Sequence, residues 1–184
     1  MLYGKRIRLR AIEREDLQSF VAWINDPEVR CNLLLYYPIS IPEEEKWYEQ
    51  MLTSPQDEHP LAIEVKTEKG WELAGNVGFI NINVHDRSAE IGIFIGRKGY
   101  WDHGYGREAL RLMVQHGFEN ININRVYLYV YETNQRGIKC YEEAGFMHEG
   151  RLREARFHEG KYIDVFVMGI LRSEWRDKKN GGEG

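Results

Sequence analysis

The first half of the chain alternates apolar and polar residues with the period of β-strands. In residues 6–10, Ile7 and Leu9 are separated and flanked by arginines, which indicates a strand with one buried face. Alternation and intervening turns predict further strands at residues 61–66, at 71–83 (as one strand or two) and at 89–95. We expect these segments to form a mainly antiparallel sheet, because short turns join most of them.

Two amphipathic helices are expected between the first and second of these strands. Apolar residues recur at helical spacing within residues 17–24, and the sequence Asn-Asp-Pro at 25–27 should end that helix. Pro42 and the glutamates at 43–45 mark the start of the next helix. Proline suits the first helical turn, and carboxylates there are stabilised by the positive end of the helix dipole.

From residue 104 onward the pattern alternates between helices and strands. It predicts two helices and three strands, at residues 104–118, 125–131, 135–144, 146–151 and 162–171. The complete order predicts an α/β (α+β) fold, with a mixed central sheet of about six to seven strands and about four helices on its faces. Without a linker or repeat, we expect one domain over residues 1–176 and a disordered polar tail at 177–184.

Composition narrows the class of protein. The 184 residues are 42% hydrophobic and 29% charged, which is typical of a globular chain. The net charge of −4 argues against nucleic acid or an anionic membrane as a partner. No apolar run approaches the roughly 20 residues needed to span a bilayer. Cys31 and Cys140 cannot build a disulfide framework or a four-cysteine zinc site, so we expect a cytoplasmic protein without a bound metal.

A glycine turn between a strand and a helix is the sharpest local feature. Gly104 and Gly106 let the backbone turn tightly and approach a ligand closely. The following helix begins with unpaired N–H groups and the positive end of its dipole, which suits a phosphate or pyrophosphate. The alternative for this loop alone is a tight strand-to-helix connection that binds nothing.

Three classes of phosphate-binding loop can be compared with this turn. The nucleoside-triphosphate loop G-x-x-x-x-G-K-[ST] is absent from the sequence. The dinucleotide fingerprint matches at Gly104, Gly106 and Ala109, but that motif belongs to the first βαβ unit of a parallel sheet. Here a long, mainly antiparallel segment precedes it. The third class is the loop that binds acyl-coenzyme A.

Four segments together resemble the GCN5-related N-acetyltransferase (GNAT) superfamily, and within it the branch that acetylates ribosomal-protein N-termini and polyamines. They are Ser-Ala-Glu-Ile-Gly-Ile at 88–93, Trp-Asp-His-Gly-Tyr-Gly-Arg-Glu-Ala at 101–109, Asn-Gln-Arg-Gly-Ile-Lys-Cys-Tyr-Glu-Glu-Ala-Gly-Phe at 134–146 and Gly-Lys-Tyr-Ile-Asp-Val at 160–165. Their order and spacing are specific, and the resemblance extends over about residues 6–171. One departure is Trp101, where the family's loop usually has Gln or Arg. Both glycines are kept, so we expect binding to be kept.

The resemblance implies that acetyl-CoA, as co-substrate, lies where two central parallel strands splay apart. Its pantetheine arm would pair with the backbone of one splayed strand, like an added strand. Its pyrophosphate would meet the N–H groups of the glycine turn, and a helix beginning near residue 134 would line its other side. The residues expected to contact it are Ile93, Phe94, Ile95, Trp101, Asp102, His103, Gly104, Tyr105, Gly106, Arg107, Asn134, Arg136, Lys139 and Tyr141.

Amine acetylation needs a deprotonated amine, a stabilised carbonyl oxygen and a proton for the departing thiolate. Tyr141 is the candidate general acid, because it lies two helical turns after Asn134 and can face the same cleft, and the resemblance points to the same position. Glu90 is the candidate base, directly or through a water, on the strand that leads into the glycine turn. The alternative is that Glu90 only binds the amine. Cys140 points about 100° away from Tyr141, which argues against an acyl-enzyme.

The predicted function is acetyl transfer from acetyl-CoA to a primary amine by direct attack in a ternary complex. The acceptor could be a protein N-terminus, a polyamine or another small-molecule amine. The aromatic and acidic residues at 36–38 and 43–45 suit a cationic amine, although the glutamates also suit a helix start. Exposed aromatic residues are compatible with a homodimer. Two alternatives are a non-catalytic acyl-CoA-binding or sensory module and a dinucleotide-dependent oxidoreductase, which the position of the loop disfavours.

Overall fold

The computed structural model describes residues 1–33 and 35–175 of the chain. Its strands form one open sheet in the order β1-β2-β3-β4-β5-β6-β8-β7. This mixed architecture confirms the predicted fold class. The tail expected at residues 177–184 lies outside the described residues and stays a prediction.

The strands are β1 (Leu2–Tyr3), β2 (Ile7–Ala11), β3 (Leu61–Thr67), β4 (Gly70–Asn83), β5 (Ser88–Ile95), β6 (Arg125–Tyr131), β7 (Met147–His158) and β8 (Lys161–Leu171). The helices are α1 (Leu17–Ile24), α2 (Pro27–Arg30), α3 (Ile41–Thr53), α4 (Tyr105–Glu119) and α5 (Gln135–Ala144). Short 3₁₀ turns cover Arg14–Asp16, Gln56–Glu58 and Lys98–Tyr100, and residues 172–175 are also helical.

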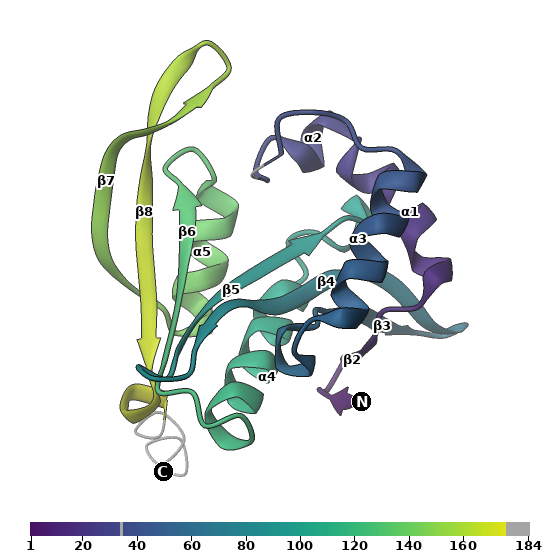
Figure 1. Ribbon diagram of the computed structural model, residues 1–184, viewed down its shortest axis with the longest axis horizontal. Helices are drawn as coiled ribbons and strands as arrows, with labels where there is room; N and C mark the ends of the chain where they lie inside the picture. Colours follow the sequence, from purple (N-terminus) through teal and green to yellow (C-terminus); the bar gives the residue numbers. More distant parts are fainter. Residues whose placement is uncertain (34, 176–184) are drawn as a thin grey trace.

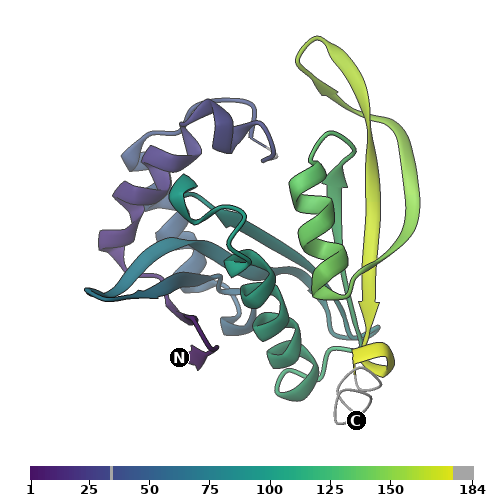
Figure 2. The same ribbon diagram turned by 180° about the vertical axis from the view of Figure 1, so that it is seen from behind.

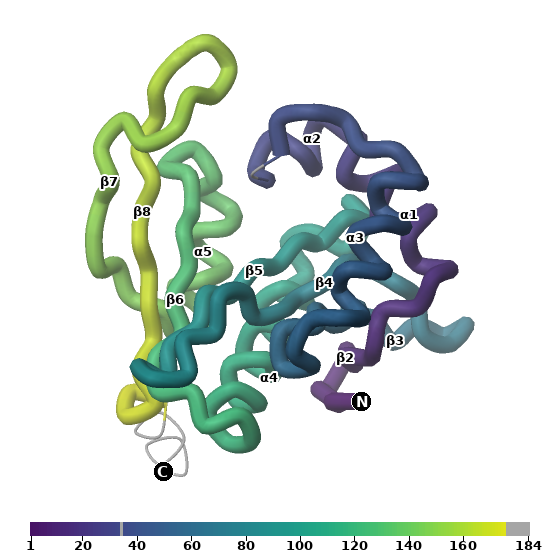
Figure 3. Tube along the Cα trace, in the orientation of Figure 1, coloured from purple at the N-terminus to yellow at the C-terminus, as the bar shows by residue number. Residues whose placement is uncertain are grey.

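The only parallel pairing among the described strands is between β5 and β6, and it is short. Ser88, Ala89 and Glu90 pair with Arg125, Val126 and Tyr127, and no pairing between the two strands follows Glu90. Beyond that point β5 continues along β4, whereas β6 continues along β8. The tube in Figure 3 shows the two strands starting together and then diverging, so the sheet opens into two halves.

Helices cover both faces of the sheet (Figures 1 and 2). The larger apolar core lies between the sheet and α4 and α5, and it includes Ile91 of β5. A second core joins α1 and α3 to the other face, where the rings of Phe94 and Phe20 lie 5.8 Å apart. Alternation along β5 therefore sends Ile91 towards α4 and Phe94 towards α1, as the period of a strand requires.

The structure differs from the sequence prediction in three local details. The edge strand β1 was not expected, and it raises the number of strands to eight, above the expected six to seven. Pro27 does not only end α1, because it also begins α2, where the Asp26 side chain accepts a hydrogen bond from the Glu28 N–H (2.9 Å). The strand β7 extends to His158, seven residues beyond the expected end at 151.

Candidate active site

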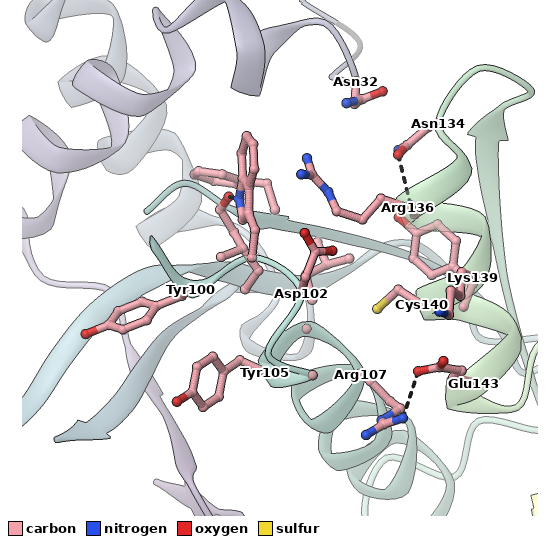
Figure 4. Close-up of a pocket in the computed structure, with 18 of the residues that line it drawn as sticks. Asn32, Tyr100, Asp102, Tyr105, Arg107, Asn134, Arg136, Lys139, Cys140 and Glu143 are labelled. Atoms are coloured by element: carbon pink, nitrogen blue, oxygen red, sulfur yellow. Dashed lines mark hydrogen bonds and ion pairs between the residues drawn. The ribbon is translucent and has the colours of Figure 1, made fainter. Parts of the chain in front are cut away.

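A cleft of about 500 Å³ occupies the opening between the two halves of the sheet (Figure 4). It is bounded by β5, by the turn that leads into α4, by α5, and by α2 and the segment that follows it. The lining residues are Val29, Asn32, Leu33, Ile93, Phe94, Ile95, Tyr100, Trp101, Asp102, Gly104, Tyr105, Gly106, Arg107, Asn134, Gln135, Arg136, Gly137, Lys139, Cys140, Tyr141 and Glu143. All the residues expected to contact acetyl-CoA are brought together here except His103.

Free backbone N–H groups line the glycine turn. In the described part of the chain, no acceptor is paired with the N–H groups of residues 102–107. Gly104 is the N-cap of α4 and has φ of +78°, and Asp102 has φ of +62°. This left-handed backbone turns successive N–H groups towards one region, which makes a nest for an anion.

Gly106 leaves room on the cleft side of this turn. A Cβ at Gly106 would lie 3.4 Å from Cys140 Sγ, 3.7 Å from Ile95 Cγ1 and 3.9 Å from Ile93 Cδ1, all of which belong to residues that line the cleft. These are ordinary van der Waals distances, so the fold itself does not require a glycine here. The space on the cleft side of Gly106 is therefore open, and its use by a ligand stays a prediction.

Trp101, the departure from the family's loop pattern, is anchored on both sides of the cleft. Its indole Nε1–H donates a hydrogen bond to the Ile95 carbonyl oxygen (2.6 Å) at the end of β5. Its ring is covered by the guanidinium of Arg136, whose Cζ lies 3.6 Å from the ring centroid. The Arg136 side chain thus reaches from α5 towards the turn (Figure 4).

Of three cationic side chains around the turn, one has a carboxylate partner among the described residues and two have none. Arg107 forms an ion pair with Glu143 of α5 (2.7 Å). Arg136 and Lys139 both line the cleft, and no carboxylate of the described residues pairs with either. Two positive side chains on α5 therefore line the same cleft as the free N–H groups of the turn, and this arrangement suits a phosphate-containing ligand.

His103 contributes to the turn without lining the cleft. Its ring stacks on Tyr105 with centroids 6.0 Å apart and an interplanar angle of 12°. Its carbonyl oxygen accepts a hydrogen bond from Arg6 Nη1 (3.0 Å), which ties the turn to the segment before β2. The residue therefore holds the turn in place through its backbone and ring.

Helix α5 positions Asn134 and Tyr141 on the same side. The Asn134 side chain is the N-cap of α5 and accepts a hydrogen bond from the Gly137 N–H (2.9 Å). Tyr141 lies two turns later, packed edge-on against Phe146 with ring centroids 6.3 Å apart. Burial raises the pKa of the Tyr141 phenol above its usual range, and the neighbouring Cys140 adds to this shift.

Cys140 is not an activated nucleophile. Burial raises the pKa of its thiol from 9.0 to about 11, with a smaller contribution from the Glu143 carboxylate. The thiol is therefore protonated at neutral pH, whereas a nucleophilic cysteine needs a depressed pKa.

A second cavity of about 300 Å³ adjoins the cleft and shares Asn32, Asn134 and Tyr141 with it. It lies between β6, the β7–β8 hairpin and the segment after α2. Its remaining lining residues are Tyr129, Val130, Tyr131, Leu152, Ala155, Arg156 and Val165. Tyr141 therefore stands where two cavities meet, which is the position that a residue contacting two reactants must occupy.

Glu90, the candidate base, lies at the base of the opening. It is the last β5 residue that pairs with β6, and it is half-buried. Its charge contributes to a raised pKa of Tyr127, after the larger effect of burial. Glu90 lines neither of the two cavities, so its catalytic role stays a prediction.

Two of the three glutamates at the start of α3 have structural partners, and the third is buried. Glu43 forms a capping box with Ser40, accepting hydrogen bonds from its backbone N–H (2.8 Å) and its hydroxyl (2.7 Å). Glu44 is buried, which raises the pKa of its carboxyl. Glu45 Oε1 lies 3.7 Å from Arg14 Nη1 in an exposed ion pair. The helix-start interpretation therefore accounts for Glu43, and none of the three lines either cavity.

Sequence reasoning missed the residues contributed by distant segments. Val29, Leu33, Tyr129 and Arg156 line the cavities but carry no local motif. The sequence signal nearest to them was the aromatic segment at 36–38, which suits a cationic amine. Within residues 1–33 and 35–175, no helix is long and apolar enough to cross a membrane. The same residues contain no cluster of three or more His, Cys, Asp or Glu suited to a metal ion.

A family model and two similar proteins indicate the same class of protein for this chain. A model of the acetyltransferase (GNAT) domain matches residues 6–147. The uncharacterized N-acetyltransferase p20 of Bacillus licheniformis is 30% identical over 176 residues, which cover 95% of this chain and 97% of that protein. The spermidine N(1)-acetyltransferase of Vibrio cholerae is 30% identical over 175 residues, which cover 95% and 98%.

A solved structure extends the likeness to three dimensions. The crystal structure of spermidine N-acetyltransferase from Vibrio cholerae in complex with CoA and spermine matches with a TM-score of 0.85 at 30% identity. The match covers 94% of this chain and 99% of that one. The similarity therefore includes both halves of the sheet and the opening between them.

Proposed function

Since this chain belongs to the GNAT family of acetyltransferases, we propose that the junction of its two cavities, at Tyr141, is where its reaction takes place. The protein is an N-acetyltransferase that moves an acetyl group from acetyl-CoA to an amine. The resemblance identified from the sequence is thereby confirmed.

Three independent features of the larger cleft suit acetyl-CoA. The free N–H groups of residues 102–107 and the cations Arg136 and Lys139 would hold its pyrophosphate. The space beside Gly106 admits a ligand that a side chain would block. The edge of β5 beyond Glu90 has no strand partner on the β6 side among the described residues, so its backbone would pair with the pantetheine arm.

The residues of the chain then act on the reacting atoms through protonation and position. When bound, acetyl-CoA supplies a thioester carbonyl and a thiol leaving group. Tyr141 stays protonated over the working pH range because burial raises its pKa, so its hydroxyl donates to the departing sulfur. The protonated Cys140 leaves direct attack by the amine as the route.

We place the acceptor in the second cavity, because Tyr141 and Asn134 line both cavities and a direct transfer requires the two reactants to meet. Glu90, at the base of the opening, would receive the amine proton directly or through a water. The similar Vibrio cholerae protein acts on spermidine, so the partner of this chain is a small-molecule amine. The alternative acceptor is the N-terminal amine of a protein, which would undergo the same reaction.

The compartment, the excluded partners and the oligomeric state expected from the sequence also belong to this proposal. We propose that the enzyme works in the cytoplasm without nucleic acid or a membrane, on the basis of its net charge of −4 and its two cysteines with free thiols. A homodimer would bury exposed aromatic side chains such as Phe157 and Tyr162, which are 55% and 65% exposed.

Calorimetry and a thiol-release assay test the proposed function together. We expect acetyl-CoA and CoA to bind with similar affinity, NAD to show no binding, and free thiol to appear with at least one amine of a panel of amino acids, polyamines, peptides and amino sugars. Tight CoA binding without turnover on any amine would favour the non-catalytic module instead. NAD binding without CoA binding would favour the oxidoreductase.

A further inference from the structure

We propose that Arg156 selects acceptors that carry an anionic group, so that the substrate class is a small primary amine with a carboxylate, as in an amino acid. This inference rests on the proposed function, because it takes the second cavity to be the acceptor site. It separates this chain from enzymes that act on polycationic polyamines, and it follows from the chemistry of the cavity wall.

The wall of the second cavity contains no carboxylate among the described residues. Its polar groups are the amides of Asn32 and Asn134, the hydroxyls of three tyrosines and the guanidinium of Arg156. A polyamine entering this space would bring two or more ammonium groups, which lose hydration and meet a like charge in Arg156. Burying unpaired charges and placing like charges together both oppose binding.

Arg156 is held at the wall without an acidic partner. It is half-buried, and its Nη1 donates a hydrogen bond to the Tyr36 hydroxyl (2.9 Å) from the segment after α2. No carboxylate of the described residues forms an ion pair with it. A planar guanidinium with free donors matches a carboxylate, to which it can donate two parallel hydrogen bonds.

The acidic groups near the hairpin are already engaged elsewhere. Asp164 accepts hydrogen bonds from Arg151 and from the Glu154 N–H (2.7 Å). Glu132 accepts hydrogen bonds from the Asp164 N–H (3.0 Å) and from Arg151 Nη2 (3.3 Å). The exposed Glu154 and Glu159 line neither cavity. Arg151 is thus neutralised within the hairpin, whereas Arg156 is left to face the cavity.

The rest of the cavity suits a compact apolar side chain. Tyr131 is only 7% exposed, and Leu152 and Val165 complete an apolar wall. A volume of about 300 Å³ admits one small molecule. Since Tyr141 lines both cavities and Arg156 lines only the second, the amine would lie towards Tyr141 and the carboxylate towards Arg156.

Two acceptors that differ only at the carboxylate measure how much that group contributes to the reaction. Leucine and leucinamide differ only at that group, and the amine of the amide is the more readily deprotonated of the two. We expect kcat/KM of the wild-type enzyme to be about 10- to 100-fold higher for leucine than for leucinamide, the range of a hydrogen bond to a charged group. We expect the same ratio or more against spermidine. Equal or greater activity with spermidine would overturn the inference.

Variants at Arg156 assign the selectivity to this residue. We expect Arg156→Gln to abolish the preference for leucine over leucinamide, and Arg156→Glu to reverse the order of leucine and spermidine, with acetyl-CoA affinity unchanged in both. The control is Arg153→Gln, since Arg153 is an exposed arginine of the same strand that lines neither cavity. If Arg156→Gln lowers activity equally for every acceptor, the selectivity lies elsewhere and the inference is wrong.

A binding measurement separates this inference from the proposed function. If the wild-type protein acetylates no amine of the panel, calorimetry with leucine and spermidine on the CoA-saturated protein still reports on the cavity. Binding of leucine that Arg156→Gln weakens at least tenfold supports the anionic selectivity. Absence of leucine binding, or binding that Arg156→Gln leaves unchanged, refutes it.

Discussion

The guanidinium of Arg136 lies over the indole ring of Trp101, with Cζ 3.6 Å from the ring centroid, and joins α5 to the turn before α4. The indole is itself fixed by its hydrogen bond to the Ile95 carbonyl oxygen (2.6 Å). The tryptophan that departs from the family's loop pattern therefore has a partner on the opposite wall. The cation–π contact holds the Arg136 side chain across the cleft, where we propose that the pyrophosphate of the cofactor binds.

This stacking predicts a spectroscopic change on binding. We expect CoA to alter tryptophan fluorescence through Trp101, because the other four tryptophans line neither cavity: Trp23, Trp47, Trp71 and Trp175. Trp101→Phe should remove most of the change. Arg136→Lys keeps the charge but loses the planar contact, so we expect the Kd for CoA to rise about 3- to 10-fold. An unchanged signal in Trp101→Phe would contradict this assignment.

A methyl group at Gly106 should weaken cofactor binding without unfolding the protein. The added Cβ has its nearest neighbour at 3.4 Å, so we expect Gly106→Ala to keep its melting temperature within a few degrees. The same carbon occupies the cleft, and we expect the Kd for acetyl-CoA to rise about tenfold, or 1.4 kcal/mol. Calorimetry measures the affinity. Gly99→Ala is the matched control, because a Cβ there meets nothing within 4 Å.

Removal of one oxygen at Tyr141 should separate catalysis from binding. We expect Tyr141→Phe to lower kcat about 100-fold, the lower end of the range for general acids, with the Kd for acetyl-CoA within about threefold. The ring packing against Phe146 is retained in this variant. Tyr48→Phe, which removes a phenol from the α1–α3 core, is the control. Turnover that stays at the wild-type level across pH would show that the phenol donates no proton.

The sequence could predict those parts of the site whose structure depends on residues adjacent in the chain. Helix α5 runs from Gln135 to Ala144 as expected, because Asn134 caps its start and Gly145 adopts the left-handed conformation that ends it (φ of +111°). The glycine turn was found because its conformation depends on residues adjacent in the chain. Such features need no knowledge of the tertiary structure.

The parts formed by distant segments could not be predicted in the same way. Tyr36 and Arg156 are 120 residues apart, and their hydrogen bond depends on how α2 and the β7–β8 hairpin meet across the opening. Arg156 lies between the strands predicted at 146–151 and 162–171, and a single arginine there gives no indication of which cavity it will line. The glutamates at 43–45 show the opposite case, since the helix-start alternative could be read from neighbouring residues, and none of the three lines either cavity.

The raised pKa of Cys140 predicts slow alkylation and no role in acyl transfer. In a Cys31→Ser background, we expect the rate with iodoacetamide to rise tenfold per pH unit from pH 8 to 10, because the thiolate fraction keeps rising below a pKa of about 11. An ordinary thiol, with a pKa of 9.0, would level off near pH 9. We also expect Cys140→Ser to retain turnover. A plateau near pH 9 would contradict the raised pKa, and a folded but inactive Cys140→Ser variant would contradict direct transfer to the amine.

Glu90 can be tested as a base against its alternative as an amine-binding group. We expect Glu90→Gln to lower kcat/KM for the acceptor about 100-fold at pH 7, with acetyl-CoA affinity unchanged because Glu90 lines neither cavity. Glu68→Gln, at an exposed turn, is the control.

The pH dependence and the split between kcat and KM together decide between the two roles of Glu90. If the carboxylate removes the proton of the ammonium, the loss in Glu90→Gln should lie in kcat at pH 7 and should shrink towards pH 10, where the amine is already deprotonated in solution. If the carboxylate only holds the ammonium, its attraction also fades as the amine loses its charge, but the loss should lie in KM for the acceptor. We expect a loss in kcat that shrinks, since Glu90 stands where β5 and β6 separate, at the floor of the opening in which the reactants would meet. A loss confined to KM for the acceptor would contradict the role of Glu90 as a base.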